Sequence, residues 1–198
     1  GISACYANLG VNAWEQSNYK VAVGYYMEAV RIDSAMHDTL GVSSAYNNIG
    51  IIYAIQEDFD AALVYLNKAL ELRRAINNMR EVGLTLRNIA GVYADKEECE
   101  KALELLAEAV EVSQNVGDAR GEAQCYESMA ECYKWMGQLD NALEYANKAY
   151  DILYAIGYKR GLASLNTLLG DVYLELGDAQ KAITHYVAGY ELALELGM

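Results

Sequence analysis

Hydrophobic and polar positions along the chain follow the spacing of amphipathic helices arranged in pairs. Within residues 41–80, one helical face has the i, i+3, i+4, i+7 spacing and carries Tyr46, Ile49, Gly50 and Tyr53. The charged segment 56–60 interrupts this face, and a second apolar face follows it. That second face carries Ala62, Leu63, Leu66, Ala69, Leu70 and Ile76. The pattern therefore predicts two helices joined by a short turn.

The same pattern returns every forty residues without insertions. Small residues recur at one position, which reads Gly10, Gly50, Ala90, Ala130 and Gly170. Alanine recurs without exception at another, which reads Ala22, Ala62, Ala102, Ala142 and Ala182. A strict period of this length is typical of stacked repeats. We predict a single array over residues 1–198, with about ten antiparallel helices in the repeats 1–40, 41–80, 81–120, 121–160 and 161–198.

The recurring small residues predict close packing between the two helices of each pair. A glycine inside a helix costs roughly 1 kcal/mol relative to alanine, so its use indicates a contact that recovers more than this. We expect the recurring alanines to form the reciprocal surface. Each second helix ends at a residue type that tolerates the left-handed backbone conformation. These residues are His37, Asn77, Gly117, Gly157 and Gly197.

The second repeat resembles the signature of the tetratricopeptide repeat family. The residues that carry the resemblance are Tyr46-x2-Ile49-Gly50-x2-Tyr53, then Ala62-x3-Leu66 and Ala69. All five repeats follow this pattern in outline. The period of forty rather than about thirty-four, and the lack of any proline, are similar to the long-repeat variant found in Pins-type adaptors and bacterial signalling proteins. The resemblance implies an all-α, right-handed superhelical solenoid of five helix-turn-helix hairpins.

In this family the first helices line the concave side of the superhelix, where an extended peptide binds. The corresponding positions here change residue type from repeat to repeat, as a binding surface requires, although an ordinary solvated face would vary in the same way. The groove residues that the resemblance implies are Trp14, Asn47, Asn48, Ile51, Arg87, Asn88, Glu127, Glu131, Lys134, Trp135, Thr167 and Asp171.

Two roles are open for the asparagines and tryptophans among these residues. An asparagine amide both donates and accepts hydrogen bonds, so a row of asparagines could hold a peptide backbone. The alternative is that Asn47, Asn48 and Asn88 bond to a neighbouring helix and fix the stacking of the repeats. Trp14 and Trp135 could anchor a partner, as aromatic residues do in many interfaces, or could fold onto their own hairpins.

Charge narrows the class of partner. The formal net charge of −13 argues against binding to a nucleic-acid backbone or an anionic membrane surface. Among the groove positions the acidic residues outnumber the basic ones and gather toward the C-terminal repeats, while the second repeat is neutral and partly apolar. We therefore expect a protein or peptide partner that carries apolar and basic residues. The apolar runs are too short for insertion into a membrane.

No pattern in the chain predicts catalysis, a cofactor or a metal site, so we expect a protein that is not an enzyme. His37 and His185 lie in different repeats, and the sequence contains no metal-ligand spacing, phosphate-binding loop or nucleophile elbow. We expect the four cysteines to be unpaired. Unpaired thiols and the lack of a secretory signal favour the cytoplasm, with a periplasmic or extracytoplasmic location as the alternative.

The last repeat carries an apolar stripe where repeat arrays usually have a polar cap. The stripe consists of Leu165, Leu169, Val172 and Leu176. Three explanations are open: more sequence follows in the parent protein, the C-terminal end pairs with another copy, or the second helix of the same repeat covers the stripe. The start at Gly1, in register with Gly41, favours a piece of a longer protein.

Two functions fit these observations. The first is a non-catalytic protein–protein interaction scaffold, an adaptor whose groove binds an extended peptide segment of another protein. The alternative is the regulatory or sensory region of a larger bacterial signalling protein, which acts through its own effector domain or through self-association. A structural spacer without a ligand is a third explanation.

Overall fold

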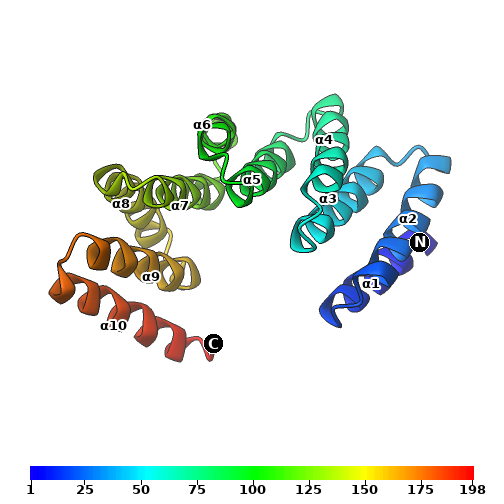
Figure 1. Cartoon of the computed structure of the whole chain (residues 1–198). Helices are drawn as coiled ribbons and strands as arrows, with labels where there is room; N and C mark the ends of the chain where they lie inside the picture. The colour runs from blue at the N-terminus through cyan, green and yellow to red at the C-terminus, as the bar shows by residue number, and fades with distance from the viewer. The chain divides into compact units, whose positions relative to one another are not determined.

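The computed structural model describes all residues, 1–198, as ten α-helices without strands (Figure 1). The helices are α1 (Ile2–Glu15), α2 (Tyr19–Ala35), α3 (Thr39–Ile55), α4 (Phe59–Ala75), α5 (Met79–Asp95), α6 (Cys99–Asn115), α7 (Ala119–Trp135), α8 (Leu139–Ala155), α9 (Lys159–Glu175) and α10 (Ala179–Glu195). The all-α prediction is confirmed, and so is the number of helices.

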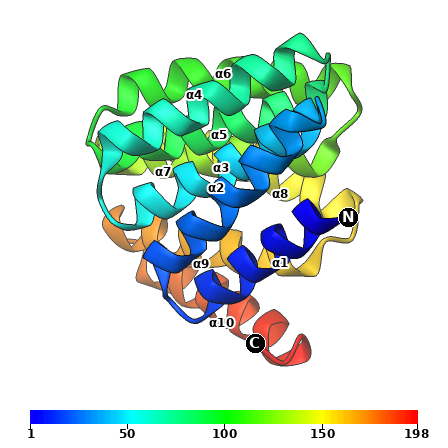
Figure 2. The ribbon, with the colours of Figure 1, turned by 90° about the vertical axis from the view of Figure 1, so that its right-hand side faces the viewer.

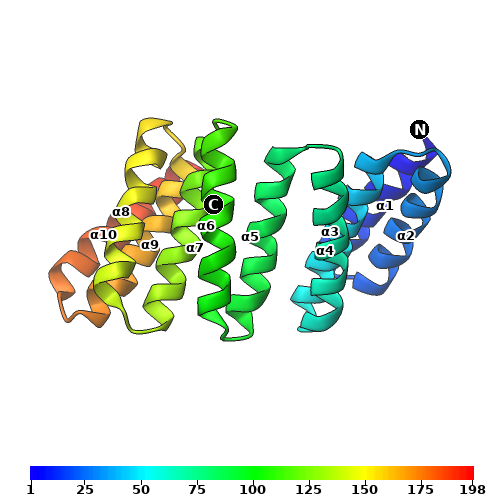
Figure 3. The same ribbon diagram turned by 90° about the horizontal axis from the view of Figure 1, so that it is seen from above.

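The chain divides into two compact units, Gly1–Val92 and Tyr93–Met198, with the division inside α5. In the first unit, α1 packs against α2 and α3 packs against α4, and α2 also contacts α3 (Figures 1 and 2). In the second unit, α7 pairs with α8 and α9 pairs with α10 (Figures 1 and 3). There, α6 contacts α7 and α8 contacts α9. Each unit is thus built from consecutive helical hairpins.

The small residues of the first helices lie where the second helices approach most closely. A Cβ atom added to Gly50 would lie 2.6 Å from Cγ of Leu66, and one added to Gly10 would lie 2.8 Å from Cε1 of Tyr26. The predicted close contact is therefore confirmed. The facing side chains, however, come one turn after the recurring alanines, which are themselves almost fully buried, as for Ala22 (0% exposed).

All ten helices end in the same hydrogen-bonded turn. At the end of α3, the Glu57 N–H donates to the Ala54 carbonyl at 2.9 Å and the Asp58 N–H donates to the Tyr53 carbonyl at 3.0 Å. This pair of bonds is the Schellman motif, which needs one residue in the left-handed conformation. The residues that adopt it are Ser17, His37, Glu57, Asn77, Glu97, Gly117, Gly137, Gly157, Gly177 and Gly197. The five positions predicted from the sequence are among them.

Replacing Glu57 with glycine should stabilise the first unit. Glu57 has φ 61°, a conformation that costs a residue with a Cβ atom about 1 kcal/mol and costs glycine little. We expect Glu57→Gly to raise the free energy of unfolding by about 0.5–1 kcal/mol, measured by urea denaturation.

The matched control is the reverse change at Gly137, which has φ 71° and has no atom within 4 Å of an added Cβ. Gly137→Glu should lower the free energy of unfolding of the second unit by a similar amount. An added Cβ contacts no other atom there. Unchanged stability in both variants would therefore show that the left-handed backbone conformation has no measurable cost at these positions.

Candidate functional site

An arginine from α4 lies in the interior of the first unit. The Arg73 side chain is 2% exposed, and its Nη2 pairs with the Glu81 carboxylate at 2.8 Å. Its Nη1 donates to Asn47 Oδ1 at 3.1 Å, to the Glu81 carbonyl at 3.2 Å and to the Thr85 hydroxyl. Asn88 Nδ2 donates to the same Asn47 oxygen at 3.0 Å. One buried polar network therefore joins α3, α4 and α5.

This network offsets part of the energetic cost of burying a guanidinium group, although the Arg73 Nε atom has no hydrogen-bond partner. Burial lowers the pKa of Arg73, and the Glu81 carboxylate opposes that shift. A buried charge loses its hydration, and removing one of its partners is far more costly than losing a surface ion pair. Asn47 is itself 4% exposed, so its oxygen serves the interior of the protein. The structure thus favours the stacking role for Asn47 and Asn88.

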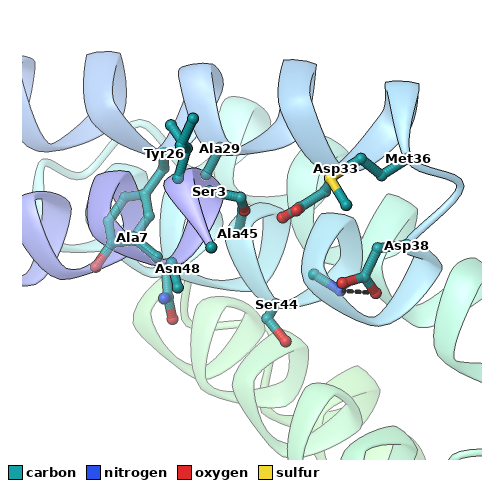
Figure 4. Close-up of a pocket in the computed structure, with 14 residues that line it drawn as sticks. Ser3, Ala7, Tyr26, Ala29, Asp33, Met36, Asp38, Ser44, Ala45 and Asn48 are labelled. Carbon is teal, nitrogen blue, oxygen red and sulfur yellow. Dashed lines mark hydrogen bonds between the residues drawn. The ribbon is translucent and has the colours of Figure 1, made fainter.

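The other predicted residues of the first unit differ in their surroundings. Trp14 is partly buried and packs against a hydrophobic core of the first unit that includes Ala22 and Tyr26. This contact favours the role in which Trp14 folds onto its own hairpin. Ile51 and Arg87 are also partly buried. Asn48 lines a cavity between α1, α2 and α3 (Figure 4).

In the second unit, side chains of α7, α9 and α10 form a polar cluster. Lys134 Nζ pairs with Asp171 Oδ2 at 3.0 Å, and the Tyr186 hydroxyl donates to the other oxygen of Asp171 at 2.8 Å. The Ser164 hydroxyl donates to the Glu127 carboxylate at 2.7 Å. The structure therefore brings together groove residues that were predicted from two different repeats.

Glu131 lies among carboxylates on this same surface. Burial raises its pKa, and the carboxylates of Glu127 and, to a smaller extent, Asp95 raise it further, while Lys134 lowers it. The side chain of Glu131 nevertheless reaches solvent. Because the neighbouring carboxylates make the surroundings of Glu131 negative, a positive group placed there would be attracted and would favour the ionised form of Glu131.

The two remaining predicted residues of this surface are exposed. Trp135, one helical turn after Glu131, is 81% exposed, so it does not fold onto its own hairpin. Thr167 is exposed, and its hydroxyl donates to the Ala163 carbonyl at 3.3 Å. Residues four apart on a helix are neighbours on its surface. Trp135 and Glu131 therefore present an aromatic and an acidic group side by side.

Side chains capable of chemistry are dispersed. His185 Nδ1 bonds with Asn166 Oδ1 at 2.9 Å, and burial lowers the pKa of His185. Cys132 is buried beside Cys99, and burial is the main cause that raises its pKa to about 12. No group of three or more His, Cys, Asp or Glu residues is arranged to hold a metal ion. None of the ten helices combines the length and apolar character needed to cross a bilayer.

Removing the Asn47 side chain should destabilise the first unit. Asn47→Ala takes one acceptor from Arg73 and the acceptor from Asn88, and a buried donor without a partner costs about 1–3 kcal/mol. We expect a loss of that size in the free energy of unfolding, measured by urea denaturation. Asn12→Ala, at an exposed position of α1, should change it by less than about 0.5 kcal/mol. Equal stability of the two variants would contradict the structural role of Asn47.

The comparisons with known proteins agree with this architecture. The family model described as tetratricopeptide repeat matches residues 2–75, 81–155 and 128–195. No curated protein matches the chain.

Three solved structures illustrate the likeness in fold. A Rap protein complexed with competence and sporulation factor has a TM-score of 0.84 at 22% identity, over 96% of this chain and 53% of that one. BtubC (BKLC) from P. vanneervenii has a TM-score of 0.82 at 19% identity, over 97% and 80%. The Rap conjugation gene regulator of plasmid pLS20, in complex with the Phr* peptide, has a TM-score of 0.82 at 18% identity, over 97% and 53%.

The chain thus spans about half the length of these Rap proteins. At such low identity the likeness concerns the fold. The family model, by contrast, matches nearly the whole sequence. The chain is a repeat scaffold that belongs to the tetratricopeptide repeat family.

Proposed function

We propose that this chain is a protein-interaction scaffold whose first helices bind an extended peptide segment with apolar and basic residues. The observation that carries the proposal is the pairing of Trp135 with Glu131 on α7. Trp135 is 81% exposed, and the pKa of Glu131 is raised by burial and by neighbouring carboxylates. An aromatic anchor beside a carboxyl group that forms no ion pair suits a peptide that carries an apolar residue next to lysine or arginine.

The rest of the surface has the properties of a polar rim. Lys134 and Asp171 neutralise each other, and Glu127 is engaged by Ser164, so these groups keep their partners when no peptide is bound. Glu131 is joined to no cation by an ion pair. A peptide could therefore bring a positive charge to Glu131 without breaking an existing bond.

The structural neighbours support a peptide ligand by analogy. One Rap protein of similar fold is complexed with competence and sporulation factor, and another is in complex with the Phr* peptide. We extend this kind of ligand to the present chain as part of the proposal. The same surface would also serve the alternative role, a regulatory region of a larger signalling protein, if its peptide came from an attached effector domain.

Selection of peptides from a random display library tests the proposal even while the natural partner is unidentified. We expect the selected peptides to combine an aromatic or aliphatic residue with lysine or arginine. Trp135→Ala should weaken their binding about thirtyfold, because an aromatic anchor contributes about 2 kcal/mol or more. Glu131→Gln should weaken it about two- to fivefold, since an exposed ion pair contributes about 0.2–1 kcal/mol. Fluorescence polarisation measures both effects.

Two matched variants lie on second helices of the same unit. Tyr154→Ala removes another exposed aromatic residue, from α8 (71% exposed), and Glu111→Gln neutralises an exposed carboxylate of α6. Both should bind the selected peptides as the native chain does. Peptides without basic residues, or equal losses in the control variants, would refute the proposed surface.

A specific observation also favours self-association as a second function. Most of the stripe predicted on the last repeat is covered, because Leu165, Leu169 and Val172 are at most 1% exposed, whereas Leu176 is 44% exposed. An apolar stripe is instead exposed on α10. It consists of Ile183, Val187, Tyr190 and Leu194, between 49% and 64% exposed. Their spacing places them on one face of the helix, where they could pack against the same face of a second copy.

Sedimentation velocity over a range of concentrations tests this pairing. The native chain should dimerise as its concentration rises, and Val187→Lys, at a residue 49% exposed, should keep it monomeric. Val64→Lys, at a residue of α4 that is 52% exposed, should dimerise normally. A native chain that stays monomeric throughout would rule out self-association through α10.

A further inference from the structure

We call the junction of the first and second repeats the first interface, and the junction of the second and third repeats the second interface. Arg73 fills the second interface, and the first interface has no arginine at the corresponding position. Arg73, Asn47, Glu81, Thr85 and Asn88 correspond, forty positions earlier, to Asp33, Ala7, Gly41, Ala45 and Asn48. An acid thus replaces the arginine, and the three residues that bond to it, Asn47, Glu81 and Thr85, are replaced by alanine or glycine. Only Asn88, which bonds to Asn47 rather than to Arg73, is kept, as Asn48.

These five residues line one cavity between α1, α2 and α3 (Figure 4). Its volume of roughly 330 Å³ is at the lower end of the range of about 300–1,000 Å³ typical of small-ligand sites. The space that Arg73 and its partners fill in the second interface is therefore open in the first.

The cavity is acidic, and the carboxylate of Asp33 in it has no partner. The residue Asp33 is 6% exposed, and no hydrogen bond or ion pair in the structure reaches its carboxylate. The buried Tyr26 hydroxyl lies near the Asn48 side chain but makes no hydrogen bond of standard geometry. A second carboxylate, that of Asp38, lines the cavity and accepts the Gly41 N–H at 3.0 Å. No lysine or arginine lines it. A buried, unpaired carboxylate is costly unless a cation joins it.

Gly41 leaves space for the Asp33 carboxylate. A Cβ atom added there would overlap the Asp33 carboxylate, whereas the corresponding residue of the second interface is the full side chain of Glu81. The lack of a side chain therefore leaves the Asp33 oxygens room at the cavity wall.

We propose that this cavity is a binding site for a guanidinium group, with Asp33 as its ionic partner and with Asn48 and Tyr26 as further polar partners. The preference for guanidinium over ammonium follows from the second interface, where the same place in the fold holds the fork of Arg73 between an amide and a carboxylate. A planar fork of donors matches a carboxylate in two directions at once. The site belongs to the first unit and does not depend on the peptide surface of α7 and α9.

Isothermal titration of the native chain with Nα-acetylarginine amide tests the site. We expect saturable binding that Asp33→Asn weakens at least about tenfold, because hydrogen bonds to a charged group contribute more than neutral ones. The neutral analogue Nα-acetylcitrulline amide should bind the native chain at least as weakly as Nα-acetylarginine amide binds Asp33→Asn. Asp33→Asn changes the charge but hardly the shape, and circular dichroism checks that the variant is folded.

Two further titrations distinguish the possible sources of the guanidinium group. L-Arginine that binds more tightly than the blocked form would support a small-molecule ligand at the site, and the reverse order would support an arginine side chain of a polypeptide. Because Gly1 also lines the cavity, each titration is repeated on a chain whose amino terminus is acetylated, which should bind equally well. Absence of saturable binding by both arginine ligands, equal binding by Asp33→Asn, or equal binding of citrulline would overturn the proposal.

Discussion

The close approach of two helices at one small residue is the constraint on which each hairpin depends. At Gly50 the side chain of Leu66 and the carbonyl of Ala62 occupy the space that a Cβ atom would need, so the axes are as near as the backbones permit. Gly170 meets the Tyr186 ring in the same way. The glycines weaken their own helices by roughly 1 kcal/mol each, and dense packing across the hairpin offsets that loss. With the hairpins fixed in this way, and all helix ends closed by the same turn, the repeats differ mainly in their side chains.

Side chains at one recurring position decide how neighbouring repeats join. Arg73 crosses the second interface as a buried ion, with partners on both sides. Asp33 at the first interface leaves a cavity. At the last interface the same position is Leu153, which is 1% exposed and packs into a hydrophobic core of the second unit with Leu165 and Leu169. The same backbone geometry thus accommodates a buried ion pair, a cavity or an apolar contact between neighbouring repeats. The residue at this one position determines which of the three forms.

How much could be predicted from the sequence follows from the range of the interactions involved. The helices and the left-handed stops at residues such as Asn77 depend on local spacing and backbone preference, which a single sequence displays. The stops at Glu57 and Glu97 were missed because glutamate has no preference for positive φ, and hydrogen bonds of the turn impose it there. The role of Asn47 could not be read from its own repeat, since burial and its partner Arg73 come from the packing of α4. A comparison of residues forty positions apart would have shown the exchange of Arg73 for Asp33, but not the cavity.

Asp33 and Glu131 differ from many of the other acids in a chain with a net charge of −13. Many of the acids are satisfied locally. Asp38, Asp58, Asp118 and Asp178 accept backbone N–H groups at the starts of α3, α4, α7 and α10. Others, such as Glu98 with Lys101, form ion pairs along one helix. Asp33, in the cavity of the first unit, and Glu131, on the solvated face of α7, have neither kind of partner. Both proposed cation sites rest on this local lack of a partner. Asp33 is 6% exposed, so binding there should be less sensitive to salt, because buried charges are screened much less than exposed ones.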